Sequence, residues 1–352
     1  MRQVIYPDFT ITPSLPINYK DVTAFCKDGL QYKTREVFKL ELLHTFIFST
    51  GLIYKPFSLL PESAIHETWF QEKNMNWYSP VRILKDLIRK RIRILPVKEK
   101  YVSLFDEWSS NHYHLHVDLL PRLLFLNKSD LTQLTLILPD KIYIKESIHS
   151  ILNIFGFTFK KVLFIKPNEI FFVKHCLFIS KTATTGLVHA PLMLQLKERL
   201  SIPKNMVIKF PKRLYVKRKN TTNRIVLNGE IVEKVLKENY GFESVDFDAY
   251  KIEDQAKLAA DAEIMVGMHG AGLTNILYMP KGGKLVEFRR DGIHLNHCYW
   301  HLASSIGIEY SIVFGEPDEK SKVLEGLGCN LTIDINQLKT VLDKVLAVNR
   351  ID

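Results

Sequence analysis

The chain has 352 residues, of which 46% are hydrophobic and 11% aromatic, a composition that excludes a wholly disordered protein. This length favours two domains of ordinary size over a single core. Lysine and arginine number 48 against 38 acidic residues, so the net charge of +10 favours acidic partners: nucleotide phosphates, anionic lipid headgroups or nucleic acid.

The first part of the chain carries no recognisable chemistry. Residues 1–4 lead into polar, proline-punctuated sequence, so no signal peptide is expected. The apolar run at 42–54 is too short to span a bilayer, and within it residues 46–54 predict two strands hinged at Gly51. Four scattered cysteines form no CxxC pair, and we expect reduced thiols of a cytoplasmic protein: Cys26, Cys176, Cys298 and Cys329.

Residues 85–95 form a basic amphipathic run. Such a run can lie on an anionic membrane surface, which would give a peripheral contact at the inner membrane. A plain solvated helix or strand face is the commoner reading of the same pattern. Both interpretations stay open at the level of sequence.

The segment at 112–123 predicts a helix with one polar and one apolar face. His114, Asp118 and Arg122 follow one another at four-residue spacing and would share a face, while leucines line another. Pro121 predicts a kink or a restart, because proline removes a helical hydrogen bond. Histidines at alternate positions do not converge on a helix, so a metal site is not expected here.

Strands and helices then alternate, which is typical of a parallel sheet covered by helices. The first series is predicted at 134–138, 144–155, 161–165 and 170–179, and a helix at 191–200 precedes a boundary near 201–211. The second series is predicted at 213–216, 229–239, 244–247, 253–262, 295–306, 310–314, 331–335 and 337–348. Two such units leave a cleft as the default ligand site.

A glycine turn follows the strand at 262–266 and opens a helix at 273–279. Gly270 and Gly272 would let the backbone approach a ligand, and the first helical amides suit a diphosphate, with His269 at the mouth of the turn. Tight packing is the alternative explanation of the glycines. Glu287 ends the next strand and could accept from ribose hydroxyls, or be a solvated strand-end charge.

Two further groups of charged residues lie near the ends of predicted strands. Arg218 and Arg224, in the basic loop 217–224, could clamp a phosphate, or the loop could simply be solvated. Asp246 and Asp248 form a DxD triplet of the kind that holds a divalent metal in many sugar-nucleotide enzymes. Such triplets are common by chance, and no metal is expected.

Three blocks in this order resemble glycosyltransferase family 61. Residues 111–123 resemble its N-Y-x-H-W-x-x-D-x-L-P-R-L, residues 215–230 its Y-x-x-R and R-x-x-x-N-E, and residues 253–287 its E-Q, V-G-x-H-G-A-G-L-T-N and V-x-E. The departures are His112 in place of an aromatic residue, Leu115 in place of tryptophan, and one extra residue in the N-E pair at 228–230.

The resemblance implies a GT-B-like α/β fold, in which two Rossmann-like domains face each other across a cleft. Residues 1–205 would bind the acceptor and residues 206–352 a nucleotide sugar, with the terminal helix a candidate to pack back on the first domain. The sugar would be transferred with inversion, without cofactor or metal, from a donor that is UDP-linked in much of the family.

The site residues follow from these blocks. His114 or Asp118 would be the catalytic base, and Asn111 and Arg122 would lie on the acceptor side. The donor would contact a larger set: Arg218, Arg224, His269, Gly270, Ala271, Gly272, Leu273, Thr274, Asn275 and Glu287.

The expected acceptor is a glycan or lipid-linked glycan, in capsule or lipopolysaccharide synthesis. Two other functions stay open: a GT-B sugar-nucleotide epimerase or hydrolase, and an inactive family member acting as a scaffold. Nucleic acid is not an expected partner, because the chain carries none of the common nucleic-acid-binding motifs.

Overall fold

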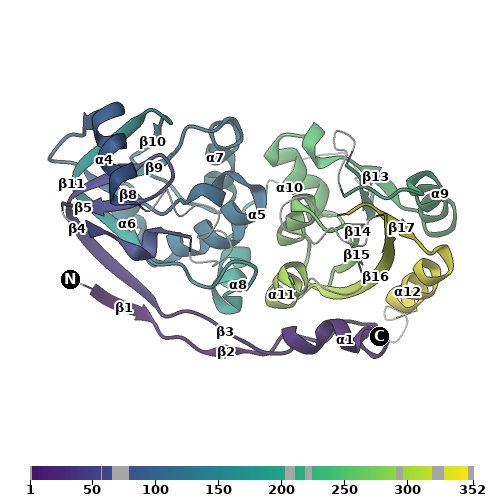
Figure 1. Cartoon of the computed structure of the whole chain (residues 1–352). Helices are drawn as coiled ribbons and strands as arrows, with labels where there is room; N and C mark the ends of the chain where they lie inside the picture. The colour runs from purple at the N-terminus through teal and green to yellow at the C-terminus, as the bar shows by residue number, and fades with distance from the viewer. Residues whose placement is uncertain are drawn as a thin grey trace. The chain divides into compact units, whose positions relative to one another are not determined.

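The computed structural model describes residues 2–56, 58–65, 79–202, 211–218, 224–290, 296–318 and 329–347. By its contacts the chain divides into two compact units (Figure 1). Unit 1 comprises Met1–Phe9 and Lys33–Thr185, and unit 2 comprises Thr10–Tyr32 and Gly186–Asp352. The boundary predicted at residues 205 and 206 lies outside the described residues.

Unit 1 is built on a mixed sheet, whose central path runs β10-β9-β8-β11-β4-β5-β6. Strands β10, β9, β8 and β11 are parallel, whereas β11, β4, β5 and β6 pair antiparallel; β1 pairs with β4 and β7 with β11. The strands are β1 (Arg2–Tyr6), β4 (Val37–Phe48), β5 (Ile53–Lys55), β6 (Ser58–Leu59), β7 (Arg91–Ile94), β8 (Lys100–Ser103), β9 (Leu134–Pro139), β10 (Lys161–Ile165) and β11 (Glu169–Ile179).

The predicted hinge at Gly51 is confirmed. Strands β4 and β5 pair antiparallel with Phe46 opposite Tyr54, and Gly51 turns the chain with a φ of 87°. A side chain at this position would collide with the backbone of Phe105 as well as adopt an unfavourable φ, so both the conformation and the space require glycine.

The described part of unit 1 also contains helices and single turns. They are η3 (Pro61–Ser63), α4 (Pro80–Arg89), η4 (Glu107–Ser110), α5 (His112–His114), η5 (Leu115–Leu119), η6 (Leu120–Phe125), α6 (Lys128–Leu131) and α7 (Ile142–Ile154). Three of these, α5, η5 and η6, form one continuous stretch that covers the segment predicted as a kinked helix.

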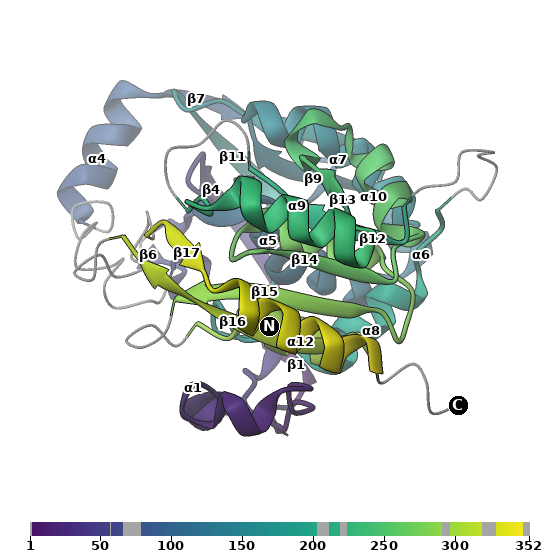
Figure 2. The same ribbon diagram turned by 90° about the vertical axis from the view of Figure 1, so that its right-hand side faces the viewer.

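Unit 2 is a sheet in the order β13-β12-β14-β15-β16-β17, parallel except for its last pair. Helices α10 and α11 lie on one side of the sheet and α9 and α12 on the other (Figures 1 and 2). The strands are β12 (Arg213–Val216), β13 (Glu243–Val245), β14 (Ile264–Met268), β15 (Lys284–Arg290), β16 (Glu309–Pro317) and β17 (Leu331–Ile333). The helices are α8 (Ala190–Glu198), α9 (Gly229–Tyr240), η7 (Phe247–Ala249), α10 (Ile252–Ala260), η8 (Ala271–Tyr278), α11 (Cys298–Ser305) and α12 (Ile335–Ala347).

An early segment of the chain also packs in unit 2. It contains β2 (Thr10–Ile11), η1 (Tyr19–Asp21), α1 (Thr23–Cys26) and η2 (Lys27–Gly29), and β3 (Tyr32–Lys33) follows at its end. Trp300 Nε1 donates to the Ser14 carbonyl at 2.7 Å, and Asn18 Nδ2 donates to the Ile312 carbonyl at 2.8 Å. These bonds tie residues 10–32 to α11 and β16, almost 300 positions later in the chain.

The terminal helix α12 packs on the sheet of unit 2, and its packing on the first domain stays a prediction. Its apolar side chains belong to a core cluster shared with the unit 2 sheet, because they recur at helical spacing: Leu338, Val341, Leu342 and Val345. Lys344 also forms an ion pair with Asp21 at 2.7 Å.

The structure therefore confirms the predicted α/β class, with one main sheet in each unit, while the GT-B arrangement stays a prediction. All four cysteines are buried free thiols, as expected for the reduced state. Within the described ranges, no helix has the length and apolar character needed to cross a bilayer.

Candidate active site

The nucleotide half of the predicted site lies in unit 2, at the carboxyl ends of three neighbouring strands. Strand order reverses between β12 and β14, since the chain goes from β12 outwards to β13 and then returns to the other side. A cavity of about 150 Å³ opens at this point and is lined by residues 216–218, 246–248, 268 and 270–273. Such switch points are where open α/β sheets bind ligands.

The glycine turn supplies amides to this cavity. Residues 271–278 form a 3₁₀ helix, in which the first intrahelical bond runs from Leu273 N to the Gly270 carbonyl at 2.9 Å. Ala271 and Gly272 precede that bond, so their N–H groups have no partner inside the helix, and both residues line the cavity.

Glycine stands at positions 270 and 272 for different physical reasons. A Cβ on Gly272 would lie 3.1 Å from Cγ1 of Val216, so close packing of the turn on β12 explains this residue. A Cβ on Gly270 would meet only ordinary contacts, the guanidinium of Arg218 among them at 3.8 Å. The tight-packing alternative is therefore correct for Gly272, while Gly270 lies directly beneath a cation.

Arg218 lines this cavity, and Arg224 lies close enough for the two charges to act on each other. Arg224 has a left-handed φ of 58°, and its Nε is buried without a hydrogen-bond partner among the described residues. Burial, and then the charge of Arg218, lower the pKa of Arg224. Two guanidinium groups that repel each other in this way favour an anion bound between them.

His269 belongs to a buried polar network on β14, β15 and β16. Its Nδ1 contacts Glu287 Oε1 and lies 3.1 Å from Nη1 of Arg289, and Tyr310 donates to the other Glu287 oxygen. The closer contact, with the carboxylate, assigns the proton to Nδ1 and leaves Nε2 as the ring nitrogen available to a ligand. The His269 side chain is 12% exposed.

The charged groups in this network shift one another's pKa values. Burial would raise the pKa of Glu287, but Arg289 and His269 together hold it below its ordinary value. Burial and Arg289 lower the pKa of His269 against the opposing effect of Glu287. His269 is thus a neutral imidazole beside an ionised carboxylate at neutral pH.

Glu287 is completely buried, and both of its oxygens accept from protein donors. This geometry favours a role in orienting His269, and the predicted contact with a ribose stays a prediction.

Three other residues that were predicted to contact the nucleotide-sugar donor are also completely buried: Leu273, Thr274 and Asn275. Asn275 Nδ2 donates to Gln255 Oε1 at 3.2 Å and to the Gly272 carbonyl at 3.1 Å, which secures the turn.

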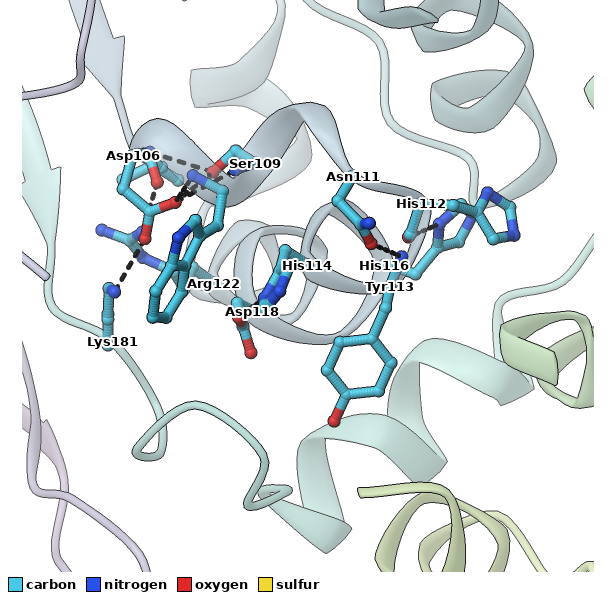
Figure 3. Close-up of polar contacts among 12 residues, drawn as sticks. Asp106, Ser109, Asn111, His112, Tyr113, His114, His116, Asp118, Arg122 and Lys181 are labelled. Atoms are coloured by element: carbon cyan, nitrogen blue, oxygen red, sulfur yellow. Dashed lines mark hydrogen bonds and ion pairs between the residues drawn. The ribbon is translucent and has the colours of Figure 1, made fainter. Parts of the chain in front are cut away.

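The second half of the predicted site lies in unit 1, on the stretch that joins α5, η5 and η6 (Figure 3). His114 Nδ1 and Asp118 Oδ2 are 2.7 Å apart, and the two side chains are 21% and 13% exposed. The predicted shared face of His114 and Asp118 is therefore confirmed. The pair forms a dyad in which the carboxylate orients the imidazole and leaves Nε2 open.

Pro121 shapes the backbone under this dyad. It has no N–H, and its ring would clash with the carbonyl four residues earlier in a regular helix. The chain widens into a π turn at residues 115–119, where the Leu120 N–H bonds the Leu115 carbonyl, and then narrows to 3₁₀ geometry at 120–125. π turns occur frequently at functional sites.

Arg122 does not share the exposure of the dyad. It is 3% exposed, and its guanidinium donates to the carbonyls of Ile179 and Leu104. Burial lowers its pKa to about 10, although Asp106 and Asp118 oppose the shift. Arg122 therefore ties the helical stretch to β11, and an acceptor contact through it stays a prediction.

Asn111 caps the start of the stretch, since its side chain accepts from the Tyr113 N–H at 2.9 Å. The neighbouring histidines point elsewhere. His112 Nδ1 is 2.6 Å from the Tyr143 hydroxyl, and buried His116 bonds the His112 carbonyl at 2.7 Å, while burial lowers the pKa of His116 to about 4. Across the described ranges, no three His, Cys, Asp or Glu side chains are grouped as metal ligands are.

A buried ion pair lies beside the turn that packs against the dyad. This pair was not predicted from the sequence. Asp106 and Lys181 are 2.7 Å apart and almost fully buried (Figure 3). Asp106 also caps η4 in a reciprocal arrangement with Ser109, and the Trp108 indole of that turn lies 5.2 Å from the His114 ring. The D-x-x-S spacing at 106–109 is the signal that indicates such a cap.

Asp106→Asn is expected to lower the free energy of unfolding by about 3–5 kcal/mol, because it leaves Lys181 buried without its counter-charge. Burial would raise the pKa of Asp106, but Lys181 holds it below its ordinary value. The stabilisation is thus present above the unfolded pKa of about 3.9 and is lost as the pH falls through the folded pKa. Urea denaturation at neutral and acidic pH measures both effects.

Asp140→Asn is the matched control, since Asp140 pairs with Lys145 at 3.0 Å on the surface of the same unit. It is expected to cost at most about 1 kcal/mol. Equal costs for the two variants at neutral pH would contradict the supporting role of the buried pair.

A comparison with protein families matches the model described as Glycosyltransferase 61 to residues 112–286. The match begins at α5, contains the His114–Asp118 dyad, both arginines and the glycine turn, and ends one residue before Glu287. The chain belongs to glycosyltransferase family 61.

Curated members of this family are similar to the chain over a limited region. EGF domain-specific O-linked N-acetylglucosamine transferase of Bos taurus is 32% identical over 103 residues, which are 28% of this chain and 19% of the relative. The Drosophila melanogaster protein of that name is 30% identical over 94 residues, 26% and 18% of the two chains. Protein O-linked-mannose beta-1,4-N-acetylglucosaminyltransferase 2 of Xenopus laevis is 27% identical over 106 residues, 29% and 18%. The chain thus spans about a fifth of the length of these relatives.

Proposed function

We propose that this protein is a glycosyltransferase that moves a sugar from a nucleotide-sugar donor to a glycan acceptor, with inversion at the anomeric carbon. The observation that carries the proposal is the cavity at the β12/β14 switch point, where turn amides and Arg218 meet in a chain of family 61. The relatives are named as N-acetylglucosamine transferases, so UDP-N-acetylglucosamine is the first donor to test.

Inversion requires one in-line displacement, in which a base takes the acceptor proton as the diphosphate leaves. The dyad geometry favours His114 as that base, because Asp118 holds its Nδ1 and leaves the Nε2 lone pair for the acceptor hydroxyl. The departing diphosphate gains negative charge, which Arg218, Arg224 and the amides of residues 271 and 272 would stabilise without a metal. No cofactor takes part in this scheme.

Product analysis tests the proposal. The protein is incubated in EDTA with a panel of nucleotide sugars and with simple glycosides or lipid-linked oligosaccharides as acceptors, and NMR reads the anomeric configuration of the product. Transfer with inversion, only when acceptor is present, is the expected result. An epimerase or hydrolase would consume the donor without acceptor, and a scaffold would bind the donor without turnover.

The cellular setting of the proposal is polysaccharide assembly in the cytoplasm, with a lipid-linked capsule or lipopolysaccharide glycan as acceptor and peripheral contact with the inner membrane. The net charge of +10 supports an anionic partner surface. Transfer to such acceptors, compared with transfer to soluble glycosides, tests this part of the proposal separately.

Donor binding is expected to take up a proton at His269. The pKa of the free imidazole is lowered, and a diphosphate bound nearby would raise it, so the ring binds a proton when the donor binds. The affinity for donor should therefore fall as the pH rises through the pKa of the complex. Three other charged groups act on this imidazole and are present both in the free protein and in the complex: Glu287, Arg289 and Arg224.

Calorimetry with a UDP-sugar in two buffers of different ionisation enthalpy measures the protons taken up. His269→Gln is expected to abolish the uptake while keeping a polar side chain in place. The same proton count in wild type and variant would contradict the assignment.

A further inference from the structure

Helix α4 has two apolar sides with different surroundings. Ile83 and Leu87 pack against the core cluster of unit 1, which includes Phe48 and Tyr54. The other apolar side points to solvent, where the side chains are spaced by three and four residues and are 62%, 60% and 76% exposed: Val81, Leu84 and Ile88. The helix thus has more apolar surface than its packing on unit 1 uses.

Cations border this exposed side. Lys85 and Arg89 are exposed neighbours of the apolar stripe and have no ion-pair partner among the described residues. The acidic residue of the helix, Asp86, lies away from the stripe and pairs with Arg82 and Lys90 at 3.3 Å each. Positive charge is therefore left next to the apolar stripe, while the negative charge is neutralised elsewhere.

Strand β7 follows α4 directly and extends the pattern (Figure 2). Side chains alternate along a strand, so Ile92 and Ile94 share one face and Arg91 and Arg93 the other. All four residues are exposed, with Ile94 at 72%. We call this surface the α4–β7 face: Val81, Leu84, Lys85, Ile88, Arg89, Ile92 and Ile94.

We propose that the α4–β7 face docks unit 1 on an anionic lipid surface. The exposed apolar side chains of α4 would enter the boundary between headgroups and acyl chains, and the cations beside them would contact lipid phosphates. A nucleic acid would use the cations but leave the apolar stripe in water, and a purely apolar protein groove would leave the cations unpaired. An anionic bilayer is complementary to both features at once.

Vesicle flotation tests this proposal, with no donor or acceptor present, so its result does not depend on the transferase activity. The full chain is expected to float with vesicles of phosphatidylcholine mixed with phosphatidylglycerol and to remain unbound with phosphatidylcholine alone. Added salt should weaken the binding, because it screens the attraction between the cations and the lipid. Absence of binding to the mixed vesicles, or equal binding to both kinds, would overturn the proposal.

Two double variants separate the apolar from the charged contribution. Leu84→Gln with Ile88→Gln, and Lys85→Gln with Arg89→Gln, are each expected to lower the partition coefficient by about tenfold or more. Glutamine keeps a high helix propensity, and all four positions are exposed, so the fold is retained and circular dichroism checks it.

Matched controls lie outside the α4–β7 face. Ile142 and Ile231 are 77% and 57% exposed on helices α7 and α9, and Lys234 and Lys237 are exposed on α9. Glutamine at either pair should leave the partition coefficient unchanged. Control variants that lose as much binding as the α4 variants, or α4 variants that bind like wild type, would overturn the assignment of this face.

Discussion

Replacing His114 with alanine is expected to lower turnover by about 10²–10⁴-fold, because the variant has no base to accept the proton of the acceptor hydroxyl. Asp118→Asn should also lower kcat, since asparagine removes the charge that orients and stabilises the imidazole at 2.7 Å. Donor affinity should stay at the wild-type value in both variants. Steady-state kinetics with saturating acceptor, together with calorimetry for the donor, measures the two quantities.

His149→Ala provides the control, because His149 is an exposed histidine on α7 of the same unit. It should retain wild-type turnover. If His114→Ala and Asp118→Asn turned over as fast as this control, the dyad could not be the catalytic base, and the proton acceptor would have to be sought elsewhere.

The double substitution Arg218→Ala with Arg224→Ala is expected to weaken donor binding by about 10²–10³-fold. Each guanidinium would make charge-assisted hydrogen bonds to the diphosphate, and each such bond contributes about 1.5–3 kcal/mol. The buried Nε of Arg224 has no hydrogen-bond partner among the described residues, and Arg218 repels the Arg224 guanidinium. Removing Arg224 therefore breaks no hydrogen bond of its Nε in the free protein and relieves this repulsion. The loss of affinity then comes from the missing contacts with the diphosphate. Calorimetric titration with UDP measures the change in Kd.

Lys234→Ala with Lys237→Ala removes the same charge from the exposed side of α9 in unit 2. This control separates a direct contact from a general loss of positive charge, because both double variants lower the net charge equally. Equal weakening of UDP binding in the two double variants would show that affinity depends only on the net charge of the protein. An unchanged Kd in the arginine variant would contradict a diphosphate site at the end of β12.

Local signals in the sequence predicted much of unit 2. The strand at 262–266, the turn glycines and the strand at 284–288 correspond to β14, the start of η8 and β15. Alternation of strands and helices also predicted the parallel sheet, because short crossovers leave few other topologies. The type of helix after the turn was not predicted, since η8 is a 3₁₀ helix and its geometry depends on packing against α10 and α11.

Contacts between distant segments could not be predicted from a single sequence. Pairing of β4 with β11 joins Phe48 to Ile170, and no local pattern encodes such a pair. The side-chain network around His269 has the same origin: His269 and Tyr310 reach Glu287 only after β14 and β16 align with β15. Glu287 and Arg289 at alternate strand positions were the single local signal that these charges share a face.

The segment that carries the dyad was predicted only in part. Four-residue spacing predicted that His114 and Asp118 meet, and Pro121 predicted a break in the helix. The spacing did not predict the burial of Arg122, because the turn from π to 3₁₀ geometry rotates this side chain inwards to the carbonyls of Ile179 and Leu104. A regular helix would have kept all three on one exposed face.

A nucleoside diphosphate is expected to bind the cavity at the carboxyl ends of β12 and β14. Amide hydrogen exchange of the wild-type protein, with and without UDP in EDTA, tests it most directly. Slower exchange is expected at residues 216–218 and 270–273 when UDP is bound. Unchanged exchange in both segments at saturating UDP, or protection confined to other parts of the chain, would contradict it.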